Sequence, residues 1–214
     1  MASIRPSANL PQGYQATVEA TQSLTQVFQN ILKKLSLPPK SNISEWADLE
    51  RKLSPEASAE PGRWQTSRAL YRLVIIDAMC DPAVETVVFM SGAQDRKTEL
   101  LLNAIGFYIC HEPSPILVLQ PSLSLGQAFL KDRLAPMIHD SEVLVDPVQD
   151  ARSRDANNTK LQKGFPGGHI TIAGSNSPAS LASRSIRICL ADEIDRCPAC
   201  AGSEGDPVAL ARKH

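Results

Sequence analysis

Three short apolar runs, separated by stretches of helical periodicity, constrain the fold of this chain more than any other feature. The runs lie at residues 86–90, 115–120 and 186–191, and they are rich in Val, Ile and Leu. Continuous apolar runs of this length are typical of strands buried on both faces of a sheet. Residues 97–110 and 123–138 carry apolar side chains at helical spacing. The alternation predicts an α/β fold with a mainly parallel sheet flanked by helices.

The N-terminal segment has a different character. Residues 14–37 contain neither Gly nor Pro and place apolar side chains at i, i+3, i+4 spacing, which predicts an amphipathic helix that Pro38-Pro39 ends. Residues 1–40 are therefore expected to form a tail and helix, and residues 41–214 the main domain. The apolar face of the helix either packs on this chain or docks a partner.

Shorter elements are predicted between these landmarks. Helices are expected from Asn42, where Glu45 forms a capping-box pattern, and at residues 67–80. Residues 61–64 are expected to form a turn and residues 150–160 a polar loop. Residues 159–163 and 169–173 are expected to pair as a hairpin.

The composition excludes several classes of protein. With 214 residues, 43% of them hydrophobic, and a net charge of −1, the chain is neither disordered throughout nor globally basic. No run of about 18 apolar residues is present, so a transmembrane helix is not expected. The five cysteines are an odd number in a chain with no secretion signal, which favours reduced thiols and a cytoplasmic location.

A candidate phosphate loop follows the first apolar run. It comprises Ser91, Gly92, Ala93, Gln94, Asp95, Arg96, Lys97 and Thr98. A loop between a buried strand and a helix can present backbone N–H groups to phosphates, while its lysine neutralises phosphate charge and its threonine binds Mg²⁺.

The last apolar run ends in Asp192-Glu193. An aspartate at the carboxyl end of a strand can hold Mg²⁺, and the adjacent glutamate can orient or deprotonate the attacking water. Ligand sites of open parallel sheets lie at these strand ends. The two motifs together therefore predict an ATP and Mg²⁺ site.

Many short motifs carry a resemblance to one family. They are Pro38-Pro39-Lys40, Ser44-Glu45-Trp46-Ala47, Leu53-Ser54-Pro55-Glu56, Pro61-Gly62-Arg63-Trp64, Ala93-Gln94, Lys97-Thr98-Glu99, Lys131-Asp132-Arg133-Leu134-Ala135-Pro136-Met137, Phe165-Pro166-Gly167-Gly168-His169, Asn176-Ser177-Pro178-Ala179-Ser180-Leu181, Asp192-Glu193-Ile194-Asp195-Arg196 and Gly202-Ser203-Glu204-Gly205-Asp206-Pro207. Through them the chain resembles, over roughly residues 38–214, the large terminase subunit of lambda-like tailed phages, the ATPase and nuclease that packages viral DNA.

The resemblance implies a P-loop ATPase core of the RecA-like, additional-strand class. By resemblance Lys97 contacts phosphates, Thr98 and Asp192 bind Mg²⁺, Glu193 is the catalytic carboxylate and Tyr71 contacts adenine. Such a subunit hydrolyses ATP to translocate double-stranded DNA into proheads in the bacterial host cytoplasm. Its implied partners are the small terminase subunit, docked on residues 14–37, the portal of the prohead and further copies in an oligomer, with no membrane involved.

The chain departs from the family pattern in three ways. Arg96 stands where the family has glycine, and Arg72 stands where a glutamine that reads adenine is expected. Family members also continue beyond Asp195-Arg196 into a coupling motif, the last strands of the ATPase sheet and a nuclease domain. These departures imply a sheet incomplete at the C-terminus, no nuclease domain, and a truncated or prophage-derived copy. The alternatives left open are an active ATPase and a catalytically silenced remnant that keeps the fold or small-subunit binding only.

Two other groups of residues have the composition of a site. Cys197 and Cys200, with Cys189 nearby, suggest a metal or redox module, but structural zinc normally has four ligands, so reduced structural thiols are favoured. A basic stretch is either a contact for DNA phosphates or a solvated loop. It comprises Arg152, Arg154, Lys160 and Lys163.

Overall fold

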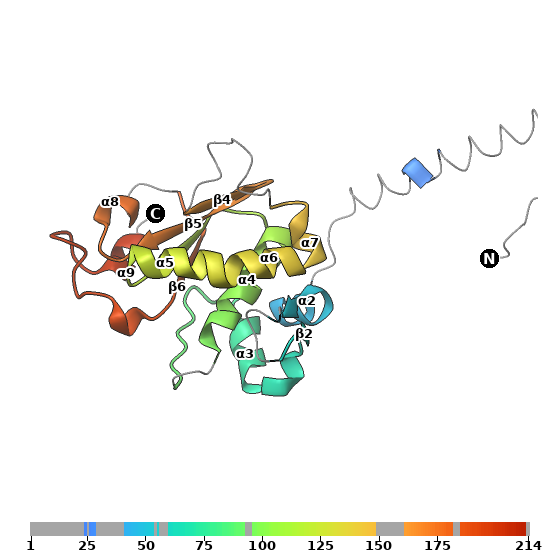
Figure 1. The fold of residues 1–214 in the computed structure, drawn as a ribbon. Coiled ribbons are helices and arrows are strands. Elements are labelled where there is room, and N and C mark those ends of the chain that lie inside the picture. The colour runs from blue at the N-terminus through green and yellow to red at the C-terminus, as the bar shows by residue number, and fades with distance from the viewer. Residues whose placement is uncertain are drawn as a thin grey trace, which may run out of the picture. The chain divides into compact units, whose positions relative to one another are not determined.

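The chain divides into two units, residues 1–40 and residues 41–214, in the computed structural model shown in Figure 1. The structure describes residues 24, 26–28, 41–53, 55, 60–92, 96–148, 161–181 and 185–212. Most of the predicted helix at residues 14–37 thus lies outside the described residues. Those that are described are helical, and Leu24, Val27 and Phe28 among them expose their side chains.

A four-stranded sheet forms the centre of the second unit, in the order β4-β5-β3-β6. Its strands are β3 (Ile116–Gln120), β4 (Gln162–Phe165), β5 (Gly168–Gly174) and β6 (Ile188–Ala191). Both β5 and β6 run parallel to β3, and β4 pairs antiparallel with β5. The α/β architecture with a mainly parallel sheet is confirmed, as is the hairpin, in which β4 begins at Gln162 and Pro166-Gly167 makes the turn.

Strand β3 is buried on both faces because its side chains alternate between two cores. Ile116 and Val118 belong to the larger core, which contains side chains of α4 (Lys97–His111). Leu117 and Leu119 belong to a smaller core on the opposite face. The strands predicted at residues 115–120 and 186–191 are both confirmed.

Helices cover the two faces of the sheet (Figure 1). On the larger core, α4 is joined by α5 (Leu123–Phe129), a π turn η2 (Leu130–Leu134), α6 (Ala135–Asp140) and α7 (Glu142–Val145). The smaller core is closed by α8 (Pro178–Leu181) and α9 (Pro207–Ala211). The predicted helices at residues 97–110 and 123–138 are confirmed, the second one with an unpredicted π turn inside it. No helix among the described residues is both long and apolar enough to span a bilayer.

A small helical layer packs against α4. It contains α2 (Ile43–Glu50), the two-stranded ribbon of β1 (Lys52–Leu53) and β2 (Gly62–Arg63), the 3₁₀ turn η1 (Thr66–Ala69) and α3 (Tyr71–Ala78). The predicted cap of α2 is present, since the Asn42 N–H donates to the Glu45 carboxylate at 3.2 Å. The turn predicted at residues 61–64 is wrong, because Gly62 pairs with Leu53 and Arg63 with Lys52 in the ribbon.

The first predicted strand, residues 86–90, is also wrong. These residues are extended but form no ladder with any strand of the described chain. Phe89 packs against the larger core, whereas Val88 is 75% exposed and Met90 is 89% exposed. An apolar run becomes a buried strand only when neighbours satisfy its backbone groups and cover both of its faces. Here only one face is covered.

Candidate functional site

The register of the sheet brings two polar side chains to the same place. Leu190 of β6 lies opposite Val118 of β3, and the Asp192 N–H continues the pairing by donating to the Leu119 carbonyl at 3.0 Å. Alternation along each strand then places Asp192 and Gln120 on the face of the sheet that α4 covers. Both side chains are buried.

The N-terminus of α4 meets these two residues. The Thr98 Oγ1 donates to Oδ2 of Asp192 at 3.3 Å, and Gln120 Nε2 donates to the same oxygen at 3.4 Å. Thr98 and Asp192 lie 94 positions apart in the sequence, yet they are direct neighbours here. A hydroxyl and a carboxylate side by side are oxygen ligands of the kind that Mg²⁺ prefers.

Lys97 is the first residue of α4 and is partly buried. Within the described ranges, its ammonium group has no hydrogen-bond or ion-pair partner. Because the N-terminus of a helix also favours anions, this position suits a phosphate group. Of the preceding loop, the Ser91 hydroxyl donates to the Gly92 carbonyl at 3.4 Å. Ala93, Gln94 and Asp95 lie outside the described residues.

Left-handed backbone occurs at two non-glycine residues of the described chain, Arg96 with φ of 51° and Glu193 with φ of 49°. Arg96 belongs to the candidate phosphate loop, and Glu193 belongs to the Asp192-Glu193 motif. This conformation costs an ordinary residue about 1–2 kcal/mol, and such strain tends to cluster at functional sites. The position where the resembling family has glycine is thus one whose backbone favours glycine.

The Arg96 side chain extends toward the carboxylate of Glu60. Its guanidinium lies 4.0 Å from the Glu60 carboxylate, which also pairs with Arg68 at 2.5 Å. All three side chains are substantially exposed, so these ion pairs contribute little to stability.

Glu193 is not an isolated carboxylate in this structure. Its Oε2 accepts a hydrogen bond from Arg196 Nη1 at 2.9 Å, and the side chain is partly exposed. Arg196 therefore holds the candidate catalytic carboxylate in an ion pair at the rim of the site.

Tyr71 lies on the exposed side of α3. Its hydroxyl accepts a hydrogen bond from Arg72 Nε at 3.1 Å, and the Arg72 guanidinium lies 5.2 Å from the centre of its ring. The contact with adenine stays a prediction for Tyr71.

The cysteines do not form the metal module considered above. All five lie in the described part of the chain and are free thiols. No group of three or more His, Cys, Asp or Glu side chains among the described residues is placed to hold a metal ion. Burial raises the pKa of Cys110 to about 11 and also raises the pKa of Cys189.

The basic stretch is only partly described. Arg152, Arg154 and Lys160 lie outside the described residues, and Lys163 is a buried residue of β4.

Sequence reasoning missed Gln120. The available signal was its position as the last residue of a buried strand directly before Pro121, where alternation places it on the same face as Ile116 and Val118. A single amide forms no sequence pattern that indicates a role. Only the pairing of β3 with β6 shows that its partner is Asp192.

Comparison with known proteins places the chain in a family. Residues 58–214 match the family profile described as phage terminase large subunit gpA, ATPase domain. The chain is 25% identical, over 184 residues, to the protein described as terminase, large subunit, of Enterobacteria phage P21. The match covers 86% of this chain but 28% of that relative, so the chain spans less than a third of its length. No solved structure matches the chain.

Proposed function

The chain belongs to the family of phage terminase large subunit ATPase domains, and from this premise we propose that residues 41–214 bind and hydrolyse ATP to power DNA packaging. The proposed fold is that of a P-loop, RecA-like ATPase. The proposed work is translocation of double-stranded DNA into proheads.

One observation carries the proposal. Thr98 and Asp192, each singled out from its own motif, are joined by a 3.3 Å hydrogen bond at the end of a parallel strand. Lys97, whose ammonium has no partner among the described residues, is the adjacent residue of the same helix. A cation for phosphates beside two oxygen ligands is the set that a Mg-nucleotide needs.

Each residue has a stated role in this proposal. Lys97 neutralises the charge of the phosphates, and Thr98 and Asp192 hold Mg²⁺, which when bound neutralises charge on the β- and γ-phosphate oxygens. Gln120 fixes the Asp192 carboxylate, and Glu193 orients the attacking water once its ion pair with Arg196 is released. The loop from Ser91 to Arg96 surrounds the phosphates, and Tyr71 contacts adenine.

We propose a protein partner from the exposed apolar side chains of the N-terminal unit. Leu24, Val27 and Phe28 expose apolar side chains on described helical residues of the N-terminal unit. This face suits docking of the small terminase subunit. The proposed setting is an oligomer at the portal of a prohead, in the cytoplasm of the bacterial host.

A second candidate function is favoured by Arg96. Its side chain occupies a backbone position that favours glycine, and bulk there opposes close approach of a phosphate to the backbone. In that case the chain is a silenced remnant, of prophage origin, which retains the fold or the binding of the small subunit.

Thermal unfolding of the whole chain with and without Mg-ATP tests both candidates. A ligand that binds only the folded state adds about 2.7 kcal/mol at a hundredfold excess over its Kd. We expect Mg-ATP to raise the Tm of the wild type, and Lys97→Ala to abolish that rise. Lys131→Ala, which removes an exposed lysine from the π turn, is the matched control and keeps the rise.

Phosphate release measured on the same samples separates the two candidates. A rise in Tm with turnover that depends on Lys97 supports the ATPase. A rise without turnover leaves binding standing but overturns hydrolysis. A cooperative transition that Mg-ATP does not move supports the silenced remnant, which keeps the fold without binding the nucleotide. No rise in the wild type overturns nucleotide binding.

A further inference from the structure

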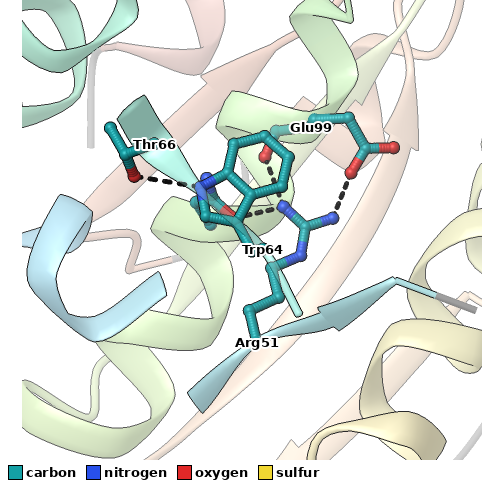
Figure 2. Close-up of polar contacts among 5 residues, drawn as sticks. Arg51, Trp64, Thr66 and Glu99 are labelled. Carbon is teal, nitrogen blue, oxygen red and sulfur yellow. Dashed lines mark hydrogen bonds and ion pairs between the residues drawn. The ribbon is translucent and has the colours of Figure 1, made fainter. Parts of the chain in front are cut away.

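Arg51 is a buried cation at the base of α4. Its side chain is only 2% exposed, and it precedes β1 directly. Figure 2 shows its guanidinium between β1 and the first turns of α4. Its Nη2 pairs with the Glu99 carboxylate, and its Nη1 donates to the Glu99 carbonyl and to Oδ1 of Asn103. Three acceptors of one helix thus converge on one side chain.

Aromatic and polar neighbours fix the other side of the guanidinium. The Arg51 Cζ lies 4.9 Å from the centre of the Trp64 ring. Trp64 Nε1 in turn donates to Thr66 Oγ1 at 3.0 Å, and the Thr66 N–H donates to the Asp48 carboxylate at 2.6 Å. Arg51 is therefore packed against Trp64, the residue after β2, and the position of Trp64 is in turn fixed by Thr66 of η1 and, through it, by Asp48 of α2.

Stability alone is a weak explanation for such a cluster. Desolvation of a buried ion pair offsets most of its attraction, and well-packed apolar side chains of similar volume are often equally stable. Arg51 Nε also has no hydrogen-bond partner among the described residues. A buried guanidinium with three directional contacts instead specifies where the helix begins and how it is rotated.

The position of Glu99 links the rotation of α4, which Arg51 sets, to the contact between Thr98 and Asp192. Glu99 directly follows Thr98, and successive residues of an α-helix point about 100° apart. The two neighbours hold α4 from different sides, since Thr98 meets Asp192 and Glu99 meets Arg51. The turn they belong to starts directly after the strained residue Arg96.

We infer that Arg51 is a positioning residue of the nucleotide site, which keeps the first turn of α4 in the rotation that brings Thr98 to Asp192. This inference rests on the proposed function and adds a residue that lies outside both motifs. It predicts that loss of Arg51 weakens the magnesium-dependent part of ATP binding.

The test is the Kd for ATP of the whole chain, measured with Mg²⁺ and again with EDTA, well below the Tm of each variant. We expect Arg51→Met to raise the Kd for Mg-ATP about tenfold, the low end of the effect of removing a residue that orients a metal ligand. The Kd in EDTA is expected to change much less. Arg51→Lys keeps the buried charge but cannot reproduce three directional bonds, so it gives an intermediate loss and carries the test if Arg51→Met does not fold.

Two controls separate positioning from loss of stability. Arg63→Met removes an exposed guanidinium from the same ribbon, where it donates to the Leu49 carbonyl rather than to α4. Leu210→Ala lowers stability through the smaller core on the opposite face of the sheet. Both are expected to keep the wild-type ratio of the two Kd values.

Each outcome decides the matter. A folded Arg51 variant with the wild-type ratio overturns the inference and leaves the proposed function standing. An equal change in Leu210→Ala overturns it as well, because the effect then belongs to stability. A wild type that does not bind Mg-ATP overturns both the proposed function and the inference.

Discussion

Strand β3 and the extended segment at residues 86–90 are two apolar runs of similar composition that lead into helices of the same domain. Every residue of β3 is buried, and both of its edges are hydrogen-bonded, to β5 and to β6. The segment at residues 86–90 has no ladder within the described chain and leaves Val88 and Met90 in solvent. Its Phe89 alone packs against the larger core.

The difference shows that the two halves of the candidate site are supported unequally: Asp192 and Gln120 extend from paired strands, whereas the loop that begins at Ser91 follows a segment that pairs with no strand of the described residues. The half of the candidate site proposed to bind magnesium, here called the magnesium side, is thus supported by the sheet. We therefore expect the magnesium side to be rigid and the phosphate side to depend more on bound ligand.

The largest expected effect tests the difference in packing directly. Leu117→Ala deletes a fully buried side chain of β3 and is expected to lower the free energy of unfolding by about 2–5 kcal/mol. Val88→Ala, at an exposed position of the unpaired segment, should stay within about 0.5 kcal/mol of wild type. Urea unfolding of the two variants provides the comparison. A cost for Val88→Ala as large as that for Leu117→Ala would show that this segment is covered in solution.

A second prediction addresses the magnesium side. Asp192→Asn removes the negative charge of a proposed Mg²⁺ ligand that Thr98 and Gln120 contact, and changes in the residues around a metal typically cost about 10–100-fold in affinity. Mg-ATP binding should therefore weaken about ten- to a hundredfold, as measured by titration calorimetry. Asp195→Asn changes an exposed aspartate in the same region and should leave the affinity unchanged. Equal losses in both variants would remove Asp192 from the site.

The smallest expected effect concerns the phosphate side. Arg96→Gly and Arg96→Ala both remove the guanidinium, but only glycine relieves the positive φ. We expect the glycine variant to be more stable than the alanine variant by about 1 kcal/mol, from their urea midpoints. The same glycine variant should bind Mg-ATP more tightly than wild type, because the backbone then lies open to the phosphates. If alanine and glycine are equally stable, strain at this residue plays no part.

Much of the sheet could be predicted because its strands have local signatures. The runs at β3 and β6 and the hairpin of β4 and β5 are visible as apolar patterns bounded by turn residues. The segment at residues 86–90 carries the same pattern, and composition cannot tell whether a neighbouring strand exists to pair with it. Pairing is a long-range property, and the prediction failed there for that reason.

The candidate site shows the same limit. The meeting of Thr98 and Asp192 was expected from the rule that the carboxyl ends of parallel strands share one edge. The strand expected before Thr98 does not form in the described chain, so the contact depends instead on the packing of α4 against the sheet. Gln120 and Arg51 were not predicted, because each acts through a partner far away in the sequence. A lone amide or arginine has no spacing pattern that would indicate such a partner.

The π turn between α5 and α6 changes how this part of the chain tolerates insertion. Ala135 N–H donates to the Leu130 carbonyl, five positions back, so the turn holds one residue more than an α-helical turn. Phe129 and Leu134 are both buried at a spacing of five, which a uniform α-helix, at about 3.6 residues per turn, would point in different directions. The extra residue keeps the two side chains in one core. A π turn is thus a place within a helix that accommodates one residue more than an α-helical turn while both flanking segments stay in contact with the core.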